Sequence, residues 1–432
     1  MRGDPRSASA RWSAGRAERI PQWQTTRLRG EDRVAIACSQ SGWAAVNPAP
    51  TQRSDLASAD LEYPLDLGLI ATSPAHPRDQ ARMMVFHRES GQVEHQKVAD
   101  LPQYLAPGSK MVVNETRVAP LRFLARRISD GREASGLFLS RAQQGRWLAM
   151  LKGSKRFRSG DELELMAPHG ASDRGGGGDR ITLHARRDLH WEVVFHSAED
   201  SLIVLERSGY TPLPPYILQA RQRAHSGEPD EGRDRSEYQT VFARASELPS
   251  CAAPTAGLHF TDQLLTAIAS RGVERVAIEL QVGTGTFRPV EAAMLSGHPM
   301  HHEQCRVSAR NLLALTAWKR DASLVVGTTS VRLLESLPSP IPSQFFETAR
   351  SMVATGSPDA AAMDFVTNIL ITPGFDFQWT NRLLTNFHLP RSTLLALVGA
   401  LVGLDQLKEL YAIAAAERYR FYSFGDAMLI LP

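Results

Sequence analysis

The middle of this chain interrupts an α/β pattern with a series of short β-strand signals. Between about residues 125 and 207, apolar runs at 136–139, 147–151, 180–183 and 191–195 alternate with polar turns and with the glycine-rich segment 175–179. Runs this short favour a small β domain, and closure into a barrel protects the strand edges. Strand and helix patterns alternate in the rest of the chain, which is typical of an α/β fold. We therefore predict an α/β protein with a small inserted β-barrel.

This pattern divides the chain into four parts. We expect a disordered N-terminal extension at 1–56, a first part of the main domain at 57–124, the inserted β-barrel at 125–207 and a second part of the main domain at 208–432. The extension contains nine Arg, no Lys and five acidic residues, and it lacks the apolar region of a secretory signal. An RNA-contacting basic arm and translation from an upstream start are alternative interpretations of this segment.

Composition excludes several classes of protein. No window contains the 18 or more consecutive apolar residues of a membrane span, so we expect no membrane insertion. The cysteines Cys38, Cys251 and Cys305 have no C-x-x-C spacing, which argues against a disulfide framework and a zinc site. The net charge of +3 is smaller than the +4 of residues 1–56 alone, so a polyanionic partner requires a local basic patch. We predict a cytoplasmic protein.

Two segments place small polar residues and glycines where a predicted strand ends. Thr255, Gly257 and His259 lie in APTAGLHFT (253–261), and glycine there allows close backbone approach to a ligand. QVGTGTFRPV (281–290) contributes Gly283, Gly285, Thr286 and Phe287. It lacks the third glycine of a nicotinamide-binding motif, so we interpret it as a turn against a ribose or purine, or as a structural tight turn.

The segment HPMHHEQC (298–305) is the densest group of potential ligands. His298, His301, His302, Glu303 and Cys305 do not follow the H-E-x-x-H spacing or a cysteine-paired zinc pattern. Three interpretations stay open: a polar pocket with an acid or base, a solvated loop, and a metal site. Histidine titrates near neutral pH, so His301 can serve as a general base.

Two predicted helices begin with polar residues after a strand. Thr328 and Thr329 open one of them, with Arg332 one turn later, and Asn386, His388 and Ser392 precede an apolar helix. Helix N-termini bind carboxylates and phosphates, which would make these residues a pocket wall. The alternatives are ordinary helix capping by Ser392 and a surface pair between Arg332 and Glu335.

Nine strings resemble, in the same order, the signature segments of the S-adenosylmethionine:tRNA ribosyltransferase-isomerase family of queuosine synthesis. They are NETRVAPLR, YTPLPPYI, YQTVFA, AAPTAGLHF, VGTGTFRPV, HPMHHE, VGTTSVRLLES, LLTNFHLPRSTLLALV and YRFYSFGDAMLI. The resemblance extends from about Leu61 to the C-terminus. It implies an irregular, barrel-like α/β domain with a small inserted β-barrel, and a cytoplasmic monomer that needs no metal.

The resemblance also implies a reaction. Members of the family transfer the ribosyl moiety of S-adenosylmethionine to 7-aminomethyl-7-deazaguanine at the tRNA wobble position. They isomerise it to epoxyqueuosine and release adenine and methionine. On this basis we expect acid or base roles for His301, Glu303 or His259. Asn114, Arg117 and Arg122 are expected to face the tRNA or its modified base, and Thr328, Thr329, Asn386 and His388 to hold the donor. Thr255, Gly285, His301, Thr329 and Asn386 should converge on one cleft.

The chain departs from the family pattern at several positions. Gln281 replaces the histidine of an L-H-V-G-A-G-T-F segment, Thr284 replaces its alanine, and Glu115 and Leu121 differ from an N-D-T-R-V-I-P-A-R segment. A related transferase with another acceptor is therefore one alternative. A non-catalytic module that binds RNA through the basic segment KGSKRFR (152–158) is a second.

Overall fold

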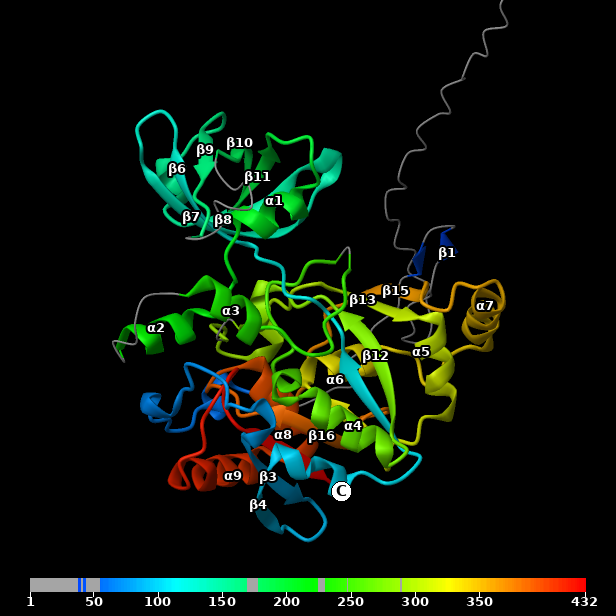
Figure 1. Cartoon of the computed structure of the whole chain (residues 1–432). Coiled ribbons are helices and arrows are strands. Elements are labelled where there is room, and N and C mark those ends of the chain that lie inside the picture. Colours follow the sequence, from blue (N-terminus) through cyan, green and yellow to red (C-terminus); the bar gives the residue numbers. More distant parts are fainter. Residues whose placement is uncertain are drawn as a thin grey trace, which may run out of the picture.

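The computed structural model describes residues 55–168, 178–223, 230–246, 248–287 and 290–432, together with the short strands β1 (Cys38–Ser39) and β2 (Gly42–Trp43). Most of the predicted extension 1–56 therefore lies outside the described residues. Figure 1 shows two parts, a large α/β domain and a small β domain that stands apart from it. The predicted α/β class with an inserted barrel is confirmed.

The large domain is built on a nine-stranded mixed sheet. Its order is β15 (Ala361–Thr367), β13 (Glu303–Ser308), β12 (Glu274–Leu280), β5 (Lys110–Asn114), β14 (Leu324–Val326), β16 (Arg382–Asn386), β17 (Ala427–Leu431), β3 (Arg82–His87) and β4 (Val93–Lys97). The central strands β12, β5, β14 and β16 are parallel, with β5 paired to both β12 and β14. The sheet ends in two edge strands, β15 and β4, so it curves without closing.

Helices cover both faces of this sheet and create two apolar cores. They are α4 (Asp262–Ser270), α5 (Ala309–Ala314), α6 (Thr328–Glu335), α7 (Ser343–Ala354), α8 (Thr393–Val402) and α9 (Leu404–Ala416). Two further helices, α2 (Pro215–Arg223) and α3 (Glu231–Glu237), lie apart from these cores, because Ile217 of α2 and Tyr238, which follows α3, belong to a separate apolar cluster. Residues of α5 to α9 share one core with Ile278 and Leu280, whereas α4 packs with Met111 and Val113 in the other. All eight residues of α6 are buried. This helix therefore starts in the interior, at the end of β14.

The small domain is a closed six-stranded antiparallel barrel. Its order is β10 (Arg180–Arg187), β11 (His190–Phe195), β8 (Trp147–Leu151), β7 (Glu133–Arg141), β6 (Arg122–Arg127) and β9 (Glu162–Leu165), with β9 pairing back to β10. Inward-facing aromatic rings fill it, among them Phe123, Phe138 and Trp147. The helix α1 (Ser201–Ser208) follows β11, and Asp200 caps it by accepting a hydrogen bond from Leu202 N. The four strand signals predicted in this region all form strands.

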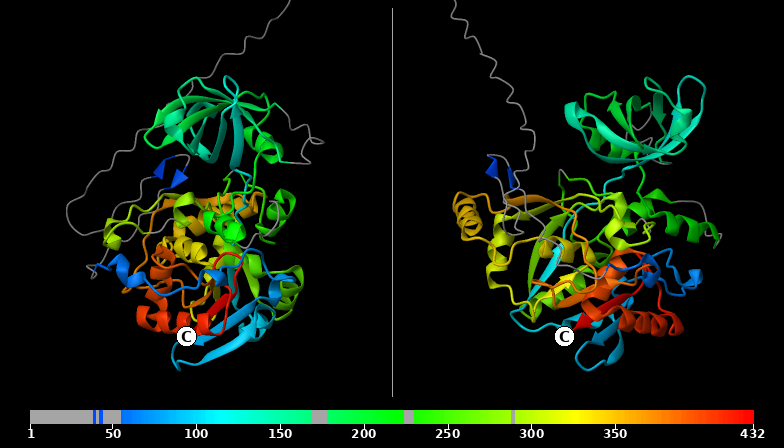
Figure 2. Two further views of the ribbon diagram at one scale, coloured as in Figure 1. Left: turned by 90° about the vertical axis from the view of Figure 1, so that its left-hand side faces the viewer. Right: turned by 180° about the vertical axis from the view of Figure 1, so that it is seen from behind.

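The chain enters and leaves the barrel through two adjacent segments. Arg122 and Tyr210 exchange backbone hydrogen bonds of 3.1 and 2.7 Å. A side chain at Gly209 would place a Cβ 1.9 Å from the carbonyl oxygen of Pro120, so glycine is required where the segments cross. Figure 2 shows the barrel projecting from the large domain in both further views. The arrangement is that of a domain inserted into a loop of another.

Candidate functional site

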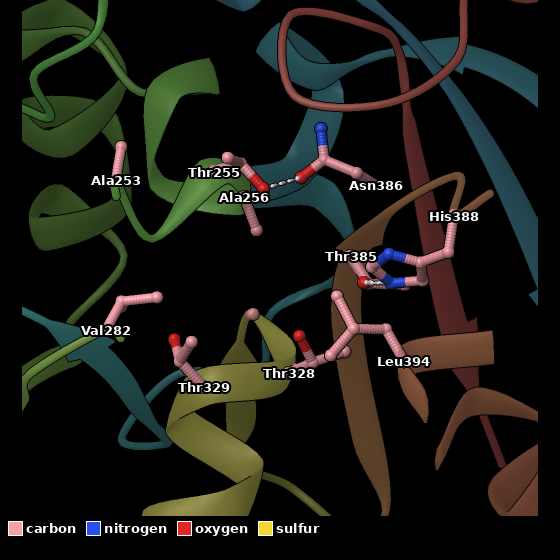
Figure 3. Close-up of a pocket in the computed structure, with 11 residues that line it drawn as sticks. Ala253, Thr255, Ala256, Val282, Thr328, Thr329, Thr385, Asn386, His388 and Leu394 are labelled. Atoms are coloured by element: carbon pink, nitrogen blue, oxygen red, sulfur yellow. Dashed lines mark hydrogen bonds between the residues drawn. The ribbon is translucent and has the colours of Figure 1, made fainter. Parts of the chain in front are cut away.

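A small cavity lined by polar and apolar side chains lies where the parallel strands β12, β14 and β16 end. Ligands bind at this edge in open α/β sheets, because the loops after neighbouring strands diverge there. The cavity is lined by Ala253, Thr255, Ala256, Val282, Gly327, Thr328, Thr329, Thr385, Asn386, His388 and Leu394. Figure 3 shows that these residues come from five separate segments. We call this the strand-end pocket.

Asn386 connects two segments of the lining with a loop outside it. Its Oδ1 accepts a hydrogen bond of 3.0 Å from Thr255 Oγ1, and its Nδ2 donates one of 2.9 Å to the carbonyl of Tyr422. Tyr422 has a positive φ of 76°, which is unusual for a bulky residue and costs free energy. Asn386 therefore holds the 3₁₀ turn Thr255–His259 and a strained loop against the end of β16.

His388 is a neutral wall of the pocket. Its Nε2 lies 2.9 Å from Thr385 Oγ1, and its backbone N–H donates to the hydroxyl of Tyr411. Complete burial lowers its pKa from 6.5 to about 3, because the charged imidazolium would lose its hydration. His388 is therefore a polar contact at neutral pH and not a cation.

The start of α6 is fixed by a buried amide. Asn114 Nδ2 donates to the carbonyl of Leu280 at 3.0 Å and to Thr329 Oγ1 at 3.4 Å, while its Oδ1 accepts from the backbone N–H groups of Thr116 and Leu280. Gly327 precedes the helix with φ 86°, a conformation that favours glycine. These contacts place Thr328 and Thr329 at the pocket. Asn114 does not line the pocket itself but holds Thr329 from outside the lining.

The segment after Val282 is held by a buried ion pair. Arg332 Nη1 donates to Glu303 Oε2, and both side chains are at most 5% exposed. The other oxygen of Glu303 accepts a bond of 3.4 Å from Gly283 N. A Cβ added to Gly285 would lie 1.6 Å from Cδ2 of His301, so the exposed imidazole rests directly on this glycine. Glu303 and Arg332 therefore position the turn on which His301 rests.

The remaining expected site residues lie outside the pocket lining. His259 is buried, with its ring nitrogens 3.1 and 3.0 Å from the carbonyls of Ala256 and Gly425, and desolvation lowers its pKa. A side chain at Gly257 would contact Thr240 and Phe242, so this glycine allows close packing within the protein. Both residues shape the 3₁₀ turn that carries Thr255.

Ser392, Arg117, Arg122 and His298 have other surroundings. Ser392 caps α8 by accepting a bond of 3.1 Å from Leu395 N, which is the capping interpretation of the sequence. Arg117 pairs with Glu206 at 3.0 Å, and Arg122 starts β6, so both lie near the connection to the barrel. His298 is half-buried at the C-terminus of a short 3₁₀ turn. The side chains of Thr286 and Phe287 lie outside the described part of the structure.

Sequence reasoning missed several residues of the pocket. Gly327, Thr385, Val282, Ala253 and Ala256 line it, and each is next to or near a residue that was predicted. Thr385 could have been predicted from the sequence, because polar residues at a buried strand end are unusual. Tyr422, which lies outside the lining and accepts a hydrogen bond from Asn386, could not be found in this way, since its role depends on a backbone conformation.

The pocket is small in this conformation. Its volume of about 20 Å³ corresponds to roughly one water molecule. It therefore matches one polar group of a ligand, with the rest of the molecule outside the lining.

The described residues contain neither a cluster of metal-binding side chains nor a membrane-spanning helix. No group of three or more His, Cys, Asp or Glu side chains is arranged to hold a metal ion in this part of the chain. Among the same residues, no helix has the length and apolar character that crossing a membrane requires.

Sequence comparisons identify relatives along nearly the whole large domain and barrel. A profile of the family described as "Queuosine biosynthesis protein" matches residues 58–430. Proteins named S-adenosylmethionine:tRNA ribosyltransferase-isomerase from Symbiobacterium thermophilum and Moorella thermoacetica are 43% and 40% identical, each over 86% of this chain and 99% of the relative. A solved structure of an S-adenosylmethionine tRNA ribosyltransferase from Thermotoga maritima is 27% identical over 86% of this chain and all of that chain, with a TM-score of 0.42. The chain belongs to the queuosine biosynthesis protein family.

Proposed function

We propose that this protein is an S-adenosylmethionine:tRNA ribosyltransferase-isomerase that acts as a cytoplasmic monomer. It transfers the ribosyl moiety of S-adenosylmethionine to 7-aminomethyl-7-deazaguanine in tRNA, forms epoxyqueuosine, and releases adenine and methionine. The observation that supports this most directly is the strand-end pocket, where Thr255, Thr329, Asn386 and His388 meet in a chain whose relatives carry this enzyme name.

The pocket suits one polar end of the donor. Thr328 and Thr329 offer hydroxyls at the start of α6, and His388 offers a neutral imidazole. Such groups can bind a carboxylate or ribose hydroxyls without introducing a competing charge. The small volume limits the pocket to one group of the donor, so the rest of the donor lies outside the lining.

His301 is the residue best placed to move a proton. The sulfonium of the donor acidifies the adjacent C5′ proton, and a positioned base that removes it forms an ylide. Departure of adenine then opens the sugar, and the aminomethyl nitrogen forms a bond to the carbon skeleton and loses a proton. Closure of the epoxide by a sugar oxygen breaks the C5′–S bond and releases methionine. Glu303 is committed to Arg332, and both nitrogens of His259 face carbonyl oxygens. We therefore assign these two residues to positioning.

Adenine release tests the proposal. Purified protein is incubated with S-adenosylmethionine, with or without tRNA that carries 7-aminomethyl-7-deazaguanine, and adenine and the mass of the RNA are measured. Release that depends on the modified tRNA, with a matching mass gain, is the expected result. Adenine release that does not depend on this tRNA contradicts the assigned acceptor and supports a related transferase with another acceptor. Gln281, which donates to the carbonyl of Pro249 at 2.6 Å, then becomes the first residue to change to histidine.

A binding measurement separates the enzyme from a non-catalytic RNA-binding module. S-adenosylmethionine at 100 times its dissociation constant stabilises the folded state by about 2.7 kcal/mol through mass action. We expect a rise in the thermal midpoint with the donor alone. An unchanged midpoint at saturating donor contradicts the donor assignment.

A further inference from the structure

A second cavity, of about 250 Å³, opens over β12 and β13. Ile278 and Leu280 of β12 pack in the core with α6, and side chains alternate along a strand, so Glu279 points to the opposite face of the sheet. Glu115, which follows β5, lines the same cavity. Its volume is just below the roughly 300–1,000 Å³ of small-molecule sites, which suits a single ring system. We call this cavity the Glu115–Glu279 cleft.

The floor of this cleft has an unused hydrogen-bond acceptor. Glu279 is 7% exposed, and its Oε1 has no hydrogen-bond partner among the described residues. By contrast, the buried carboxylate of Glu335 accepts from the backbone N–H groups of residues 378, 379 and 380. Buried polar groups are nearly always paired, so this shielded and unpaired oxygen, on a side chain that lines a cavity, points to a ligand that donates.

Burial has a further consequence for the two glutamates. Desolvation raises the pKa of Glu115 and of Glu279. Arg244 partly offsets this rise at Glu115, and a hydrogen bond with Ser246, followed by Arg306, partly offsets it at Glu279. A ligand that brings N–H donors to this floor would compensate for that loss of hydration. The preferred ligand is therefore a hydrogen-bond donor or a cation, and not an anion.

Arginine side chains lie at and around the cleft, and two of them, Arg244 and Arg306, line it. Arg244 and Arg310 share a single partner, Asp359, at 3.3 and 3.7 Å, and their side chains are 56% and 64% exposed. Arg306 pairs with Asp364 at 3.1 Å, and Arg275 lies over the ring of Phe242. The four arginines are balanced by four carboxylates, Asp359, Asp364, Glu115 and Glu279, so a contact with phosphate requires exchange of these ion pairs. Exposed ion pairs are weak, so these guanidinium groups can contact phosphates instead.

The cleft is also close to the strand-end pocket. Glu115 directly follows Asn114, whose amide lies 3.4 Å from the Thr329 hydroxyl in the pocket lining. The carboxyl end of β5 therefore separates the two cavities. A planar base in the cleft would lie beside the group that holds the donor.

We propose that the Glu115–Glu279 cleft receives the acceptor base of the RNA. The two glutamates accept hydrogen bonds from its guanine-type N–H edge, and the arginines at and around the cleft bind the flanking phosphates. A guanine edge presents adjacent N–H donors that a carboxylate can accept together, and enzymes that modify a base read such an edge after turning the base out of its stack. This inference rests on the proposed function, since it assigns residues to that acceptor.

The test compares the variants Glu115→Gln and Glu279→Gln with Glu274→Gln. Glu274 lies at the other end of β12, is 56% exposed and pairs with Lys110, so it controls for the same chemical change on the same strand. We expect kcat/KM for the modified tRNA to fall about 10- to 100-fold in the two cleft variants, as for other edge contacts to a base. The control should stay within twofold of wild type. The thermal shift caused by S-adenosylmethionine should be equal in all four proteins.

Two outcomes separate this inference from the proposed function. If wild type modifies the tRNA and both cleft variants do so equally well, the cleft assignment is overturned and the proposed function stands. If wild type releases no adenine with the modified tRNA, the proposed function fails. Calorimetry with free 7-aminomethyl-7-deazaguanine then decides about the cleft: binding by wild type that is lost in Glu279→Gln supports it, and no binding by wild type overturns it.

Discussion

The two cavities of the large domain differ in how their polar groups are satisfied. In the strand-end pocket, Asn386 and His388 are hydrogen-bonded to the protein, and the free volume is about 20 Å³. In the Glu115–Glu279 cleft, the volume is about 250 Å³, and Glu279 keeps one oxygen without a partner among the described residues. The first is preorganised by internal bonds, and the second retains bonding capacity for a ligand.

This difference matches two different tasks. Internal hydrogen bonds fix the geometry of catalytic groups, which lowers the cost of orienting a substrate. A site that selects an acceptor instead gains discrimination by leaving polar groups unpaired until the correct substrate binds. Removing the charge of a carboxylate should therefore destabilise the protein near the strand-end pocket and stabilise it in the cleft.

The largest expected effect is at Glu303. Glu303→Gln leaves Arg332 as a buried cation without its partner, so the free energy of unfolding should fall by about 3–5 kcal/mol. Denaturant unfolding measures this. Glu62→Gln is the control, because Glu62 pairs with Arg391 on the surface at 3.6 Å and should contribute at most about 1 kcal/mol. Equal losses in the two variants would contradict the structural role of the buried pair.

A second large effect is expected at a glycine. Gly285→Ala places a Cβ 1.6 Å from the imidazole of His301, so the ring or the turn must move, whereas a Cβ at Gly283 meets no atom within 4 Å. A displacement of about 1 Å can reduce a reaction rate roughly 100-fold. We expect that loss of adenine release in Gly285→Ala and a much smaller one in Gly283→Ala. Similar activity in both would remove His301 from the site.

The loss of stability at acidic pH tests whether His388 is neutral in the folded protein. Its pKa is about 3 in the folded protein and ordinarily 6.5, so the unfolded chain binds a proton that the folded protein excludes. Stability should fall as the pH decreases below about 6.5, by at most about 1.4 kcal/mol per pH unit from this residue. His388→Gln should have a shallower decline when unfolding is measured at pH 7, 6 and 5. Identical slopes would mean that His388 is charged in the fold.

The smallest expected effect is at Glu279 in the cleft, where removal of the charge should stabilise the folded protein. The pKa of Glu279 is raised by burial, so this group favours folding while protonated and loses that contribution as the pH rises. Glu279→Gln should therefore raise the thermal midpoint at pH 7 by about 2 °C, with no gain at pH 4. A lower midpoint at pH 7 would show that contacts within the protein already offset the desolvation of the Glu279 carboxylate. The contrast between the two cavities would then disappear.

The sequence predicted much of the strand-end pocket because its residues follow a recurrent rule. Thr328 and Thr329 begin a helix after β14 and Asn386 ends β16, and parallel strands end at the same edge of a sheet. Thr255 was predicted at a strand end as well, but no strand precedes it, and it begins a 3₁₀ turn after a loop. Gly285 and His301 were expected in the same cleft. They lie against each other beside the segment of Val282, outside the described lining.

Residues chosen by chemical type alone were harder to interpret. His259 and Ser392 have the right functional groups, but His259 faces two carbonyl oxygens and Ser392 caps a helix. Burial and partners decide such roles, and one sequence does not report them. Glu279 was overlooked for the same reason, since a glutamate in a strand usually faces solvent.

By itself, the sequence determined the α/β class, the inserted barrel and the family, because hydrophobic periodicity and ordered motifs are local properties of the chain. The tertiary structure alone decided which polar groups are satisfied. The pairing of Glu303 with Arg332, across 29 positions, and the unpaired oxygen of Glu279 depend on how distant segments pack. Hydrogen bonding and desolvation act through space, so the chemistry of each cavity follows from the fold and not from the order of residues.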